Sequence, residues 1–96
     1  MKVIRNIEEM LQFTIEQRSN GKIVGLVPTM GFLHEGHTSL INRATVECDI
    51  VITSLFVNPT QFAPHEDFDS YPRDFEHDHN MAKNADCDVL FAPSRE

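Results

Sequence analysis

Apolar residues fall into two alternating patterns along this chain: short continuous runs, and stripes at helical spacing. The continuous runs are rich in β-branched residues and cover 22–27, 49–57 and 88–92, with a shorter segment at 2–4. Such runs are typical of strands that are buried on both faces of a parallel sheet. We therefore expect four strands, separated by three helical segments.

The first helical segment follows the strand at 2–4 and is expected to pack without taking part in chemistry. Asn6, with Glu9 three residues further on, resembles a capping box and predicts the start of the helix. The pair Asn20-Gly21 tolerates left-handed backbone and predicts its end. The apolar stripe of this helix consists of Ile7, Met10, Leu11 and Ile15.

Two further helices are predicted after the second and third of the strands. The earlier one begins between Glu35 and His37 and runs to about Cys48, and Val46 lies off its apolar face. That face consists of Leu40, Ile41, Ala44 and Cys48. The later one covers about 72–83, and the best candidates for its buried face are Phe75, Ala82 and Ala85.

Strand, helix and strand in this order predict an α/β fold with a Rossmann-like parallel sheet and flanking helices. The strands at 22–27 and 49–57 should be parallel neighbours. Ligands of such open sheets bind beyond the carboxyl ends of the strands. The segments 28–37 and 58–62 should therefore meet over one crevice, although they are remote in sequence.

The charge balance excludes several classes of partner. Eight Lys and Arg against fifteen Asp and Glu give a net charge of -7, so we expect no nucleic acid and no membrane as a partner. No run approaches the ~20 apolar residues that span a bilayer, and charges interrupt the first residues, so we expect a cytoplasmic protein. Cys48 and Cys87 lack ligand spacing and are expected to be buried free thiols.

The loop between the strand at 22–27 and the next helix is the best candidate for a chemical site. It contains Gly31 and Gly36, which let another group approach the backbone, and His34 and His37, which are three residues apart. A helix N-terminus collects unpaired N–H groups, so the loop suits a small anion. Two alternatives remain open: the histidines only cap the helix, or they form half of a zinc site.

Other phosphate- and metal-binding devices do not occur in the sequence. There is no Gly-x-Gly-x-x-Gly and no Walker P-loop. His65, His77 and His79 lie among acidic residues, but without a cysteine at ligand spacing we expect no metal site.

The run Pro-Thr-Met-Gly-x-Leu-His-Glu-Gly-His, which ends at His37, resembles the HIGH-type signature of nucleotidylyl-transferring enzymes. Its form is that of the pantoate–β-alanine ligase family. Three later blocks resemble the same family in the same order, and together the four extend over nearly the whole chain. They are Phe56 to Phe62, Glu66-Asp67 with Tyr71-Pro72-Arg73, and Asp88 to Pro93.

The resemblance implies an enzyme that condenses pantoate with β-alanine by way of a pantoyl adenylate, releasing AMP and pyrophosphate. It implies that the loop binds ATP, that His37 is catalytic, and that Gln61 and Asn58 contact pantoate and β-alanine. The loop residues concerned are Met30, Gly31, Phe32, Leu33, His34, Glu35, Gly36 and His37. Mg²⁺ is expected with ATP, and a homodimer is expected for the full-length protein.

This chain departs from the family pattern at two places and lacks basic residues near the loop. Asp74 replaces a small hydroxyl residue, and the helix around 80–84 is less apolar. No Lys or Arg is well placed for a triphosphate, because Lys22 opens its strand at the end away from the loop and Arg43 sits well along the helix. We therefore expect 1–96 to be the N-terminal part of a nucleotide-binding domain, inactive without the remainder and a C-terminal domain. The alternatives are another adenylyl- or cytidylyltransferase, and a non-catalytic ATP- or metal-binding module.

Overall fold

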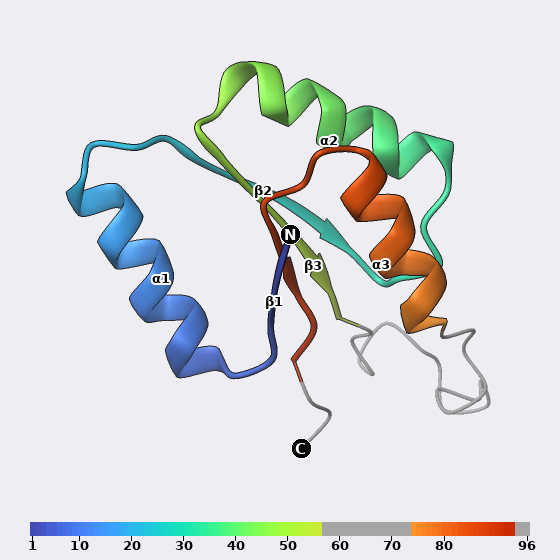
Figure 1. The fold of residues 1–96 in the computed structure, drawn as a ribbon, viewed down its shortest axis with the longest axis horizontal. Helices are drawn as coiled ribbons and strands as arrows, with labels where there is room; N and C mark the ends of the chain where they lie inside the picture. The colour runs from blue at the N-terminus through green and yellow to red at the C-terminus, as the bar shows by residue number, and fades with distance from the viewer. Residues whose placement is uncertain (57–73, 94–96) are drawn as a thin grey trace, which may run out of the picture.

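The computed structural model describes residues 1–56 and 74–93, in which four parallel strands form one sheet. The strands are β1 (Lys2–Ile4), β2 (Val24–Thr29), β3 (Ile50–Leu55) and β4 (Val89–Phe91). The helices are α1 (Ile7–Ser19), α2 (Glu35–Glu47) and α3 (Phe75–Asn84). Figure 1 shows α1 on one side of the sheet and α2 with α3 on the other. The predicted parallel α/β architecture is confirmed.

The strand order is β1-β4-β3-β2, so the first and last strands of the chain are neighbours. The β2–β3 ladder runs in register from Val24 opposite Ile50 to Thr29 opposite Leu55. The two strands of the predicted strand-helix-strand unit are therefore parallel neighbours, as expected. Their carboxyl ends lie side by side, because the N–H of Phe56 donates to the carbonyl of Thr29 at 3.0 Å.

Strand β2 begins and ends two residues later than the predicted range 22–27. It includes Pro28 and Thr29, which sequence reasoning placed in the loop. Proline is tolerated here because β2 pairs on one side only among the described strands, so its missing N–H breaks no second ladder. Strand β3 (Ile50–Leu55) is shorter than the predicted range 49–57. Asp49 and Phe56 lie outside the strand, and Val57 lies outside the described residues.

Successive residues of β3 divide the core into two layers. Val51 packs beneath α2 and α3, while Ile52, together with Ile4, packs against Met10 of α1. This alternation explains why β3 and β4 are apolar at consecutive positions: each has buried side chains on both faces. Leu90 of the central strand β4 is 0 % exposed and completes the layer under α2 and α3.

The packing face of α1 was predicted wrongly. Asn6 caps the helix by accepting from the N–H of Glu9 at 3.0 Å, and Asn20 ends it, both as expected. Only Met10 of the predicted stripe is buried, however, whereas Ile7, Leu11 and Ile15 are exposed. The face turned to the sheet also includes Phe13 and Thr14, which follow Met10 at spacings of three and four.

The packing faces of α2 and α3 were predicted in part. On α2, Ile41 is buried and Ala44 and Cys48 pack against the core, but Leu40 is exposed because it lies about 100° around the helix from Ile41. On α3, Ala82 and Ala85 are buried, whereas Phe75 is partly exposed.

Asp74, which departs from the family pattern, forms the N-cap of α3. Its carboxylate accepts from the N–H of His77 at 3.0 Å. The predicted beginning of this helix at Pro72 lies outside the described residues, and the described helix begins at Phe75.

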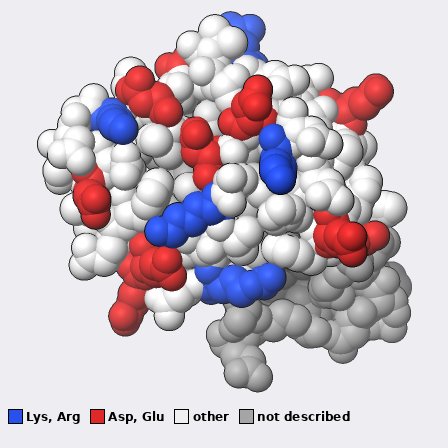
Figure 2. Space-filling model, in the orientation of Figure 1, with Lys and Arg blue, Asp and Glu red and all other residues white. Residues whose placement is uncertain are grey.

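Both cysteines are free thiols, as predicted. Cys87 is buried, and burial raises the pKa of its thiol, which favours the neutral form. Cys48 is only partly buried at the end of α2. Figure 2 shows acidic and basic side chains interspersed on the visible face, without a basic patch. Across 1–56 and 74–93, no helix has the length and apolar character needed to cross a membrane.

Candidate functional site

The loop between β2 and α2 lies at the carboxyl edge of the sheet, where the sequence placed the site. It borders a pocket of about 500 Å³. The pocket is lined by Pro28, Thr29, Met30, Gly31, Phe32, His34 and His37. Because the carboxyl end of β3 adjoins Thr29, the pocket lies at the junction of two parallel strands.

The two histidines form a reciprocal cap at the start of α2. His34 is the N-cap residue, and its Nδ1 accepts from the N–H of Gly36 at 3.0 Å. Nδ1 of His37 accepts in turn from the N–H of His34 at 3.2 Å. The two ring centroids are 4.2 Å apart, so the imidazoles lie side by side at the mouth of the pocket.

These caps determine which nitrogen carries the proton in each neutral ring. An N–H group can donate only to a nitrogen with a free lone pair, so Nδ1 is unprotonated and Nε2 carries the hydrogen. Among the described residues, neither Nε2 has a hydrogen-bond partner. Capping therefore uses one nitrogen of each ring and leaves two Nε2–H donors for a ligand. Capping of the helix and donation to an anion, which the sequence analysis treated as alternatives, are therefore compatible.

The protonation of His37 is biased toward the neutral form. Burial lowers the pKa of His37 below its ordinary value, and the nearby His34 ring lowers it further, while the Asp78 carboxylate acts in the opposite direction. At neutral pH the ring therefore donates as a neutral imidazole, and it can become cationic when negative charge develops beside it.

Gly36 makes room for the cap. A Cβ at this position would lie 2.8 Å from Cε1 of His34, closer than van der Waals contact permits. A side chain at position 36 would displace the His34 ring from the helix start, so Gly36 lets this cap form.

Several backbone N–H groups of the loop have protein partners, although the sequence predicted unpaired N–H groups at this helix start. The N–H of Gly31 donates to Oγ1 of Thr29 at 3.1 Å. Those of Phe32 and Leu33 donate to Asp78, and that of His34 donates to His37. The Nε2–H groups of the two imidazoles are therefore available as donors at this pocket.

Sequence reasoning missed two residues of α3 that hold the loop. Asp78 is only 3 % exposed, and its two oxygens accept from Leu33 at 2.7 Å and from Phe32 at 3.0 Å. His77 places Nε2 2.9 Å from the carbonyl of Leu33. One signal was available, because Asp78 follows Phe75 by three residues and precedes Ala82 by four, which places a charge on the predicted buried face.

Not all predicted site residues line the pocket. Leu33 is buried in the core beneath the loop, and Glu35 and Gly36 form the exposed first turn of α2. Asn58 and Gln61 lie outside the described residues.

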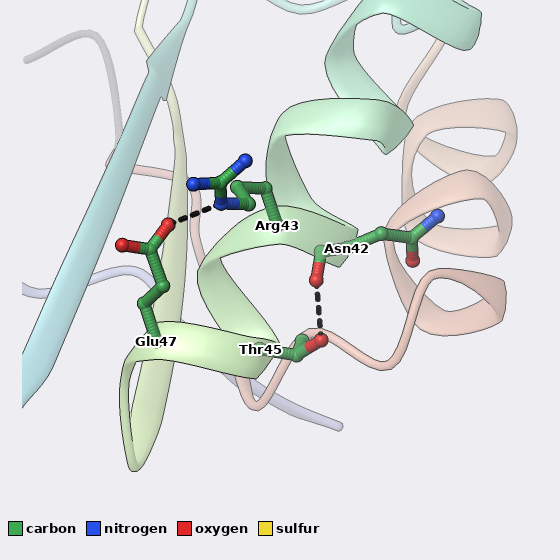
Figure 3. A network of polar contacts seen from close by, with 4 residues as sticks. All are labelled: Asn42, Arg43, Thr45 and Glu47. Carbon is green, nitrogen blue, oxygen red and sulfur yellow. Dashed lines mark hydrogen bonds and ion pairs between the residues drawn. The ribbon is translucent and has the colours of Figure 1, made fainter.

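The basic residues considered from the sequence are remote from the pocket. Lys22 lines a groove on the α1 side of the sheet. Arg43 forms an ion pair with Glu47 one turn further along α2, while Thr45 bonds the carbonyl of Asn42 (Figure 3). The described lining of the pocket therefore contains no Lys or Arg.

Comparison with known proteins gives a consistent result. The family model described as "Pantoate-beta-alanine ligase" matches residues 2–96. Pantothenate synthetases of Thermotoga petrophila and of Bacillus cereus strain AH187 are each 54 % identical over the whole chain. The chain spans about a third of the length of these curated relatives, since it covers 34 % of each.

Solved structures of the same kind share the fold. The pantoate-beta-alanine ligase of Francisella tularensis, described as a complex with "Beta-gamma ATP" and β-alanine, matches 98 % of this chain. The TM-score is 0.82 at 45 % identity, and the match covers 36 % of that protein. The pantothenate synthetase of Thermus thermophilus matches with a TM-score of 0.79 at 43 % identity, over 32 % of its length. This chain therefore belongs to the pantoate-beta-alanine ligase family.

Proposed function

We propose that this chain forms the ATP-binding part of an enzyme that joins pantoate to β-alanine. The observation that carries the proposal is the pair of Nε2–H donors, side by side at the pocket beyond strand β2. A family member with 45 % identity is described as a complex with a form of ATP and β-alanine, which supports a nucleotide in this pocket.

In the proposed reaction, a carboxylate oxygen of pantoate attacks the α-phosphorus of ATP. Pyrophosphate leaves, and the amine of β-alanine then displaces AMP from the pantoyl adenylate to give pantothenate. Such a displacement depends on positioning and charge neutralisation more than on covalent catalysis.

We assign the phosphate contacts to His34 and His37 within the ATP-binding segment 30–37. His37 is proposed as the catalytic residue that donates a hydrogen bond or a proton to the departing pyrophosphate. Asn58 and Gln61 are proposed to contact pantoate and β-alanine, because they follow β3 in sequence and β3 ends beside the pocket. These two roles rest on the family resemblance.

Magnesium would share the phosphate charge, but the described residues do not fit a protein-held Mg²⁺ site. Across 1–56 and 74–93, no group of three or more His, Cys, Asp or Glu is placed to hold a metal ion. The two Nε2 atoms carry hydrogen, and Mg²⁺ prefers oxygen ligands. We therefore propose that Mg²⁺ enters with ATP.

We propose a cytoplasmic location and, from the resemblance, a homodimeric full-length protein. We also propose that 1–96 is the N-terminal part of a Rossmann-like domain that needs further chain for activity. One helix terminus contributes roughly 0.3–2 kcal/mol toward a bound anion, whereas enzymes lower barriers by about 8 kcal/mol or more. The remaining stabilisation requires groups that the described pocket does not contain.

The test is pantoate-dependent exchange of labelled pyrophosphate into ATP, measured for the full-length protein and for residues 1–96 alone. We expect exchange by the full-length protein and none by 1–96. Absence of exchange in the full-length protein would disprove the ligase function. Equal exchange by 1–96 would show that these residues suffice.

A substitution tests the proposed contact between Gln61 and pantoate. Gln61→Ala in the full-length protein should raise the pantoate concentration needed for half-maximal rate while leaving Tm nearly unchanged. Unaltered kinetics would remove Gln61 from the site.

A further inference from the structure

We propose that Asp78 is a positioning residue of the nucleotide site, which holds the Phe32–Leu33 backbone so that the His34–His37 pair faces the pocket. This inference rests on the proposed function for its catalytic consequence. Its structural content is independent of the reaction.

The loop needs external support because its backbone is in an unfavourable conformation. Gly31 has φ of +90° and Phe32 has φ of +54°, so two consecutive residues lie in the left-handed region. For a residue with a side chain, such as Phe32, this conformation persists only where surrounding contacts impose it. Thr29, at the end of β2, accepts from the N–H of Gly31, but the next two N–H groups depend on α3.

Asp78 supplies that support with both carboxylate oxygens. Oδ1 takes the N–H of Leu33 at 2.7 Å and Oδ2 takes that of Phe32 at 3.0 Å, so one buried group holds two consecutive peptides. Bonds to a charged acceptor are stronger than neutral ones, and burial excludes competing water. A Cβ at Gly31 would lie 3.2 Å from Oδ2, which shows how closely the loop sits on the carboxylate.

The neighbouring residue of α3 holds the same peptide segment from its other side. Nε2 of His77 lies 2.9 Å from the carbonyl of Leu33, so consecutive side chains bind both the N–H and the C=O of one residue. The Leu33 side chain is 2 % exposed in the core below. The residue immediately before the His34 cap is therefore fixed at three points.

A buried carboxylate beneath an anion site is unfavourable unless it is compensated. Across the described residues, Asp78 has no Lys or Arg within salt-bridge distance, and its bonds come from loop N–H groups. It lies in the first turn of α3, where the positive end of the helix dipole also stabilises a carboxylate. Its position close to the proposed phosphate site is explained by the loop geometry that it imposes.

The test compares Asp78→Asn with the wild-type full-length protein. Asparagine keeps the shape of aspartate, but an NH₂ group replaces one of the two carboxylate oxygens. This NH₂ faces an N–H donor, so one hydrogen bond to the loop is lost. We expect amide exchange at Phe32 and Leu33 to become about tenfold faster or more, since a hydrogen bond to a charged group is lost. We also expect the pKa of His37 to fall, because Asp78 is the group that raises it.

For catalysis, we expect kcat/KM for ATP to fall about tenfold or more. Ala82→Gly serves as the matched control, because it weakens the same helix at a buried position without changing the carboxylate. It should change kcat/KM for ATP by less than about twofold at a similar loss of Tm. An equal loss of activity in both variants would reduce Asp78 to a structural role and overturn the proposal.

A second variant covers the case in which Asp78→Asn does not fold. His77→Phe keeps a ring beside Phe32 and removes the group that bonds Leu33, and its side chain is exposed enough to replace. Amide exchange in the loop should again accelerate, by a smaller factor.

The proposal is overturned if amide exchange in the loop is unchanged in the variant that folds and, where Asp78→Asn folds, the titration of His37 is unchanged as well. If the wild-type protein shows no pyrophosphate exchange, the proposed function fails. The amide-exchange measurement and the titration of His37 still decide whether Asp78 positions the loop.

Discussion

The two faces of the sheet differ in how completely the described residues cover them. On the face under α2 and α3, which we call the site face, the core is closed and α2 approaches β2 directly at Gly25. On the opposite face, α1 covers only part of the sheet and leaves a groove of about 1020 Å³. Ile23 and Leu26, both 61 % exposed, line this groove.

This difference shows which packing the site depends on. The loop, the histidine cap and Asp78 all belong to the site face, where side chains are fixed from several directions. The groove face contributes no residue to the pocket lining beyond the shared strand ends. A functional constellation needs a rigid support, and only one face of the described sheet supplies it.

The largest effect is expected for a pair of matched isoleucines in the 96-residue chain. Ile41→Ala removes a fully buried side chain from α2 and should lower the free energy of unfolding by about 2–5 kcal/mol. Ile15→Ala, on the exposed side of α1, should change it by less than about 0.5 kcal/mol. Urea unfolding followed by circular dichroism measures both. Similar losses would contradict the difference between the faces.

An intermediate effect is expected at the contact between α2 and β2. A Cβ at Gly25 would lie 2.6 Å from Sγ of Cys48, so Gly25→Ala should cost about 1–3 kcal/mol of unfolding free energy through overpacking. Removing the sulfur by Cys48→Ala should recover much of that loss. The double-mutant cycle measures the coupling. If Cys48→Ala gives no recovery, the close approach is not the cause.

The smallest effect is expected in the groove. Leu26→Thr keeps a strand-forming residue at a position that is mostly exposed, so the unfolding free energy of the 96-residue chain should change by less than about 0.5 kcal/mol in urea titrations. Val27→Thr, the neighbouring buried position on the site face, is the control and should cost clearly more. Equal shifts would mean that both faces of β2 are equally buried in solution.

Strands were predicted more accurately than helix faces for a physical reason. A strand buried on both faces needs no choice of register, so the apolar runs alone located β3 and β4. A helix exposes most of its surface, and α1 offered two apolar faces. Ile7, Leu11 and Ile15 form one at a spacing of four, and Met10 with Phe13 forms the other. Only tertiary contacts decide which face is buried.

The candidate site also contains a part that local sequence predicts and a part that depends on tertiary contacts. The His34–His37 pair was identified because its spacing is local and its helix start is marked in the sequence. The partner of the loop backbone is Asp78, more than forty residues away, and its role depends on how α3 packs beside α2. Sequence reasoning also expected free N–H groups, because it counted the donors of a helix start without the side chains that occupy them.

The pairing of β1 with β4 has a consequence for how this region folds. Lys2 lies opposite Val89 and Ile4 opposite Phe91, so the sheet joins the beginning of the chain to a strand made almost ninety residues later. Contacts of such high sequence separation slow folding, because chain entropy is lost before they form. During synthesis β1 has no partner until β4 has left the ribosome. Until then Ile4 has only Met10 and Ile52 of its buried cluster to pack against, and β4 completes the four-stranded sheet by inserting between β1 and β3.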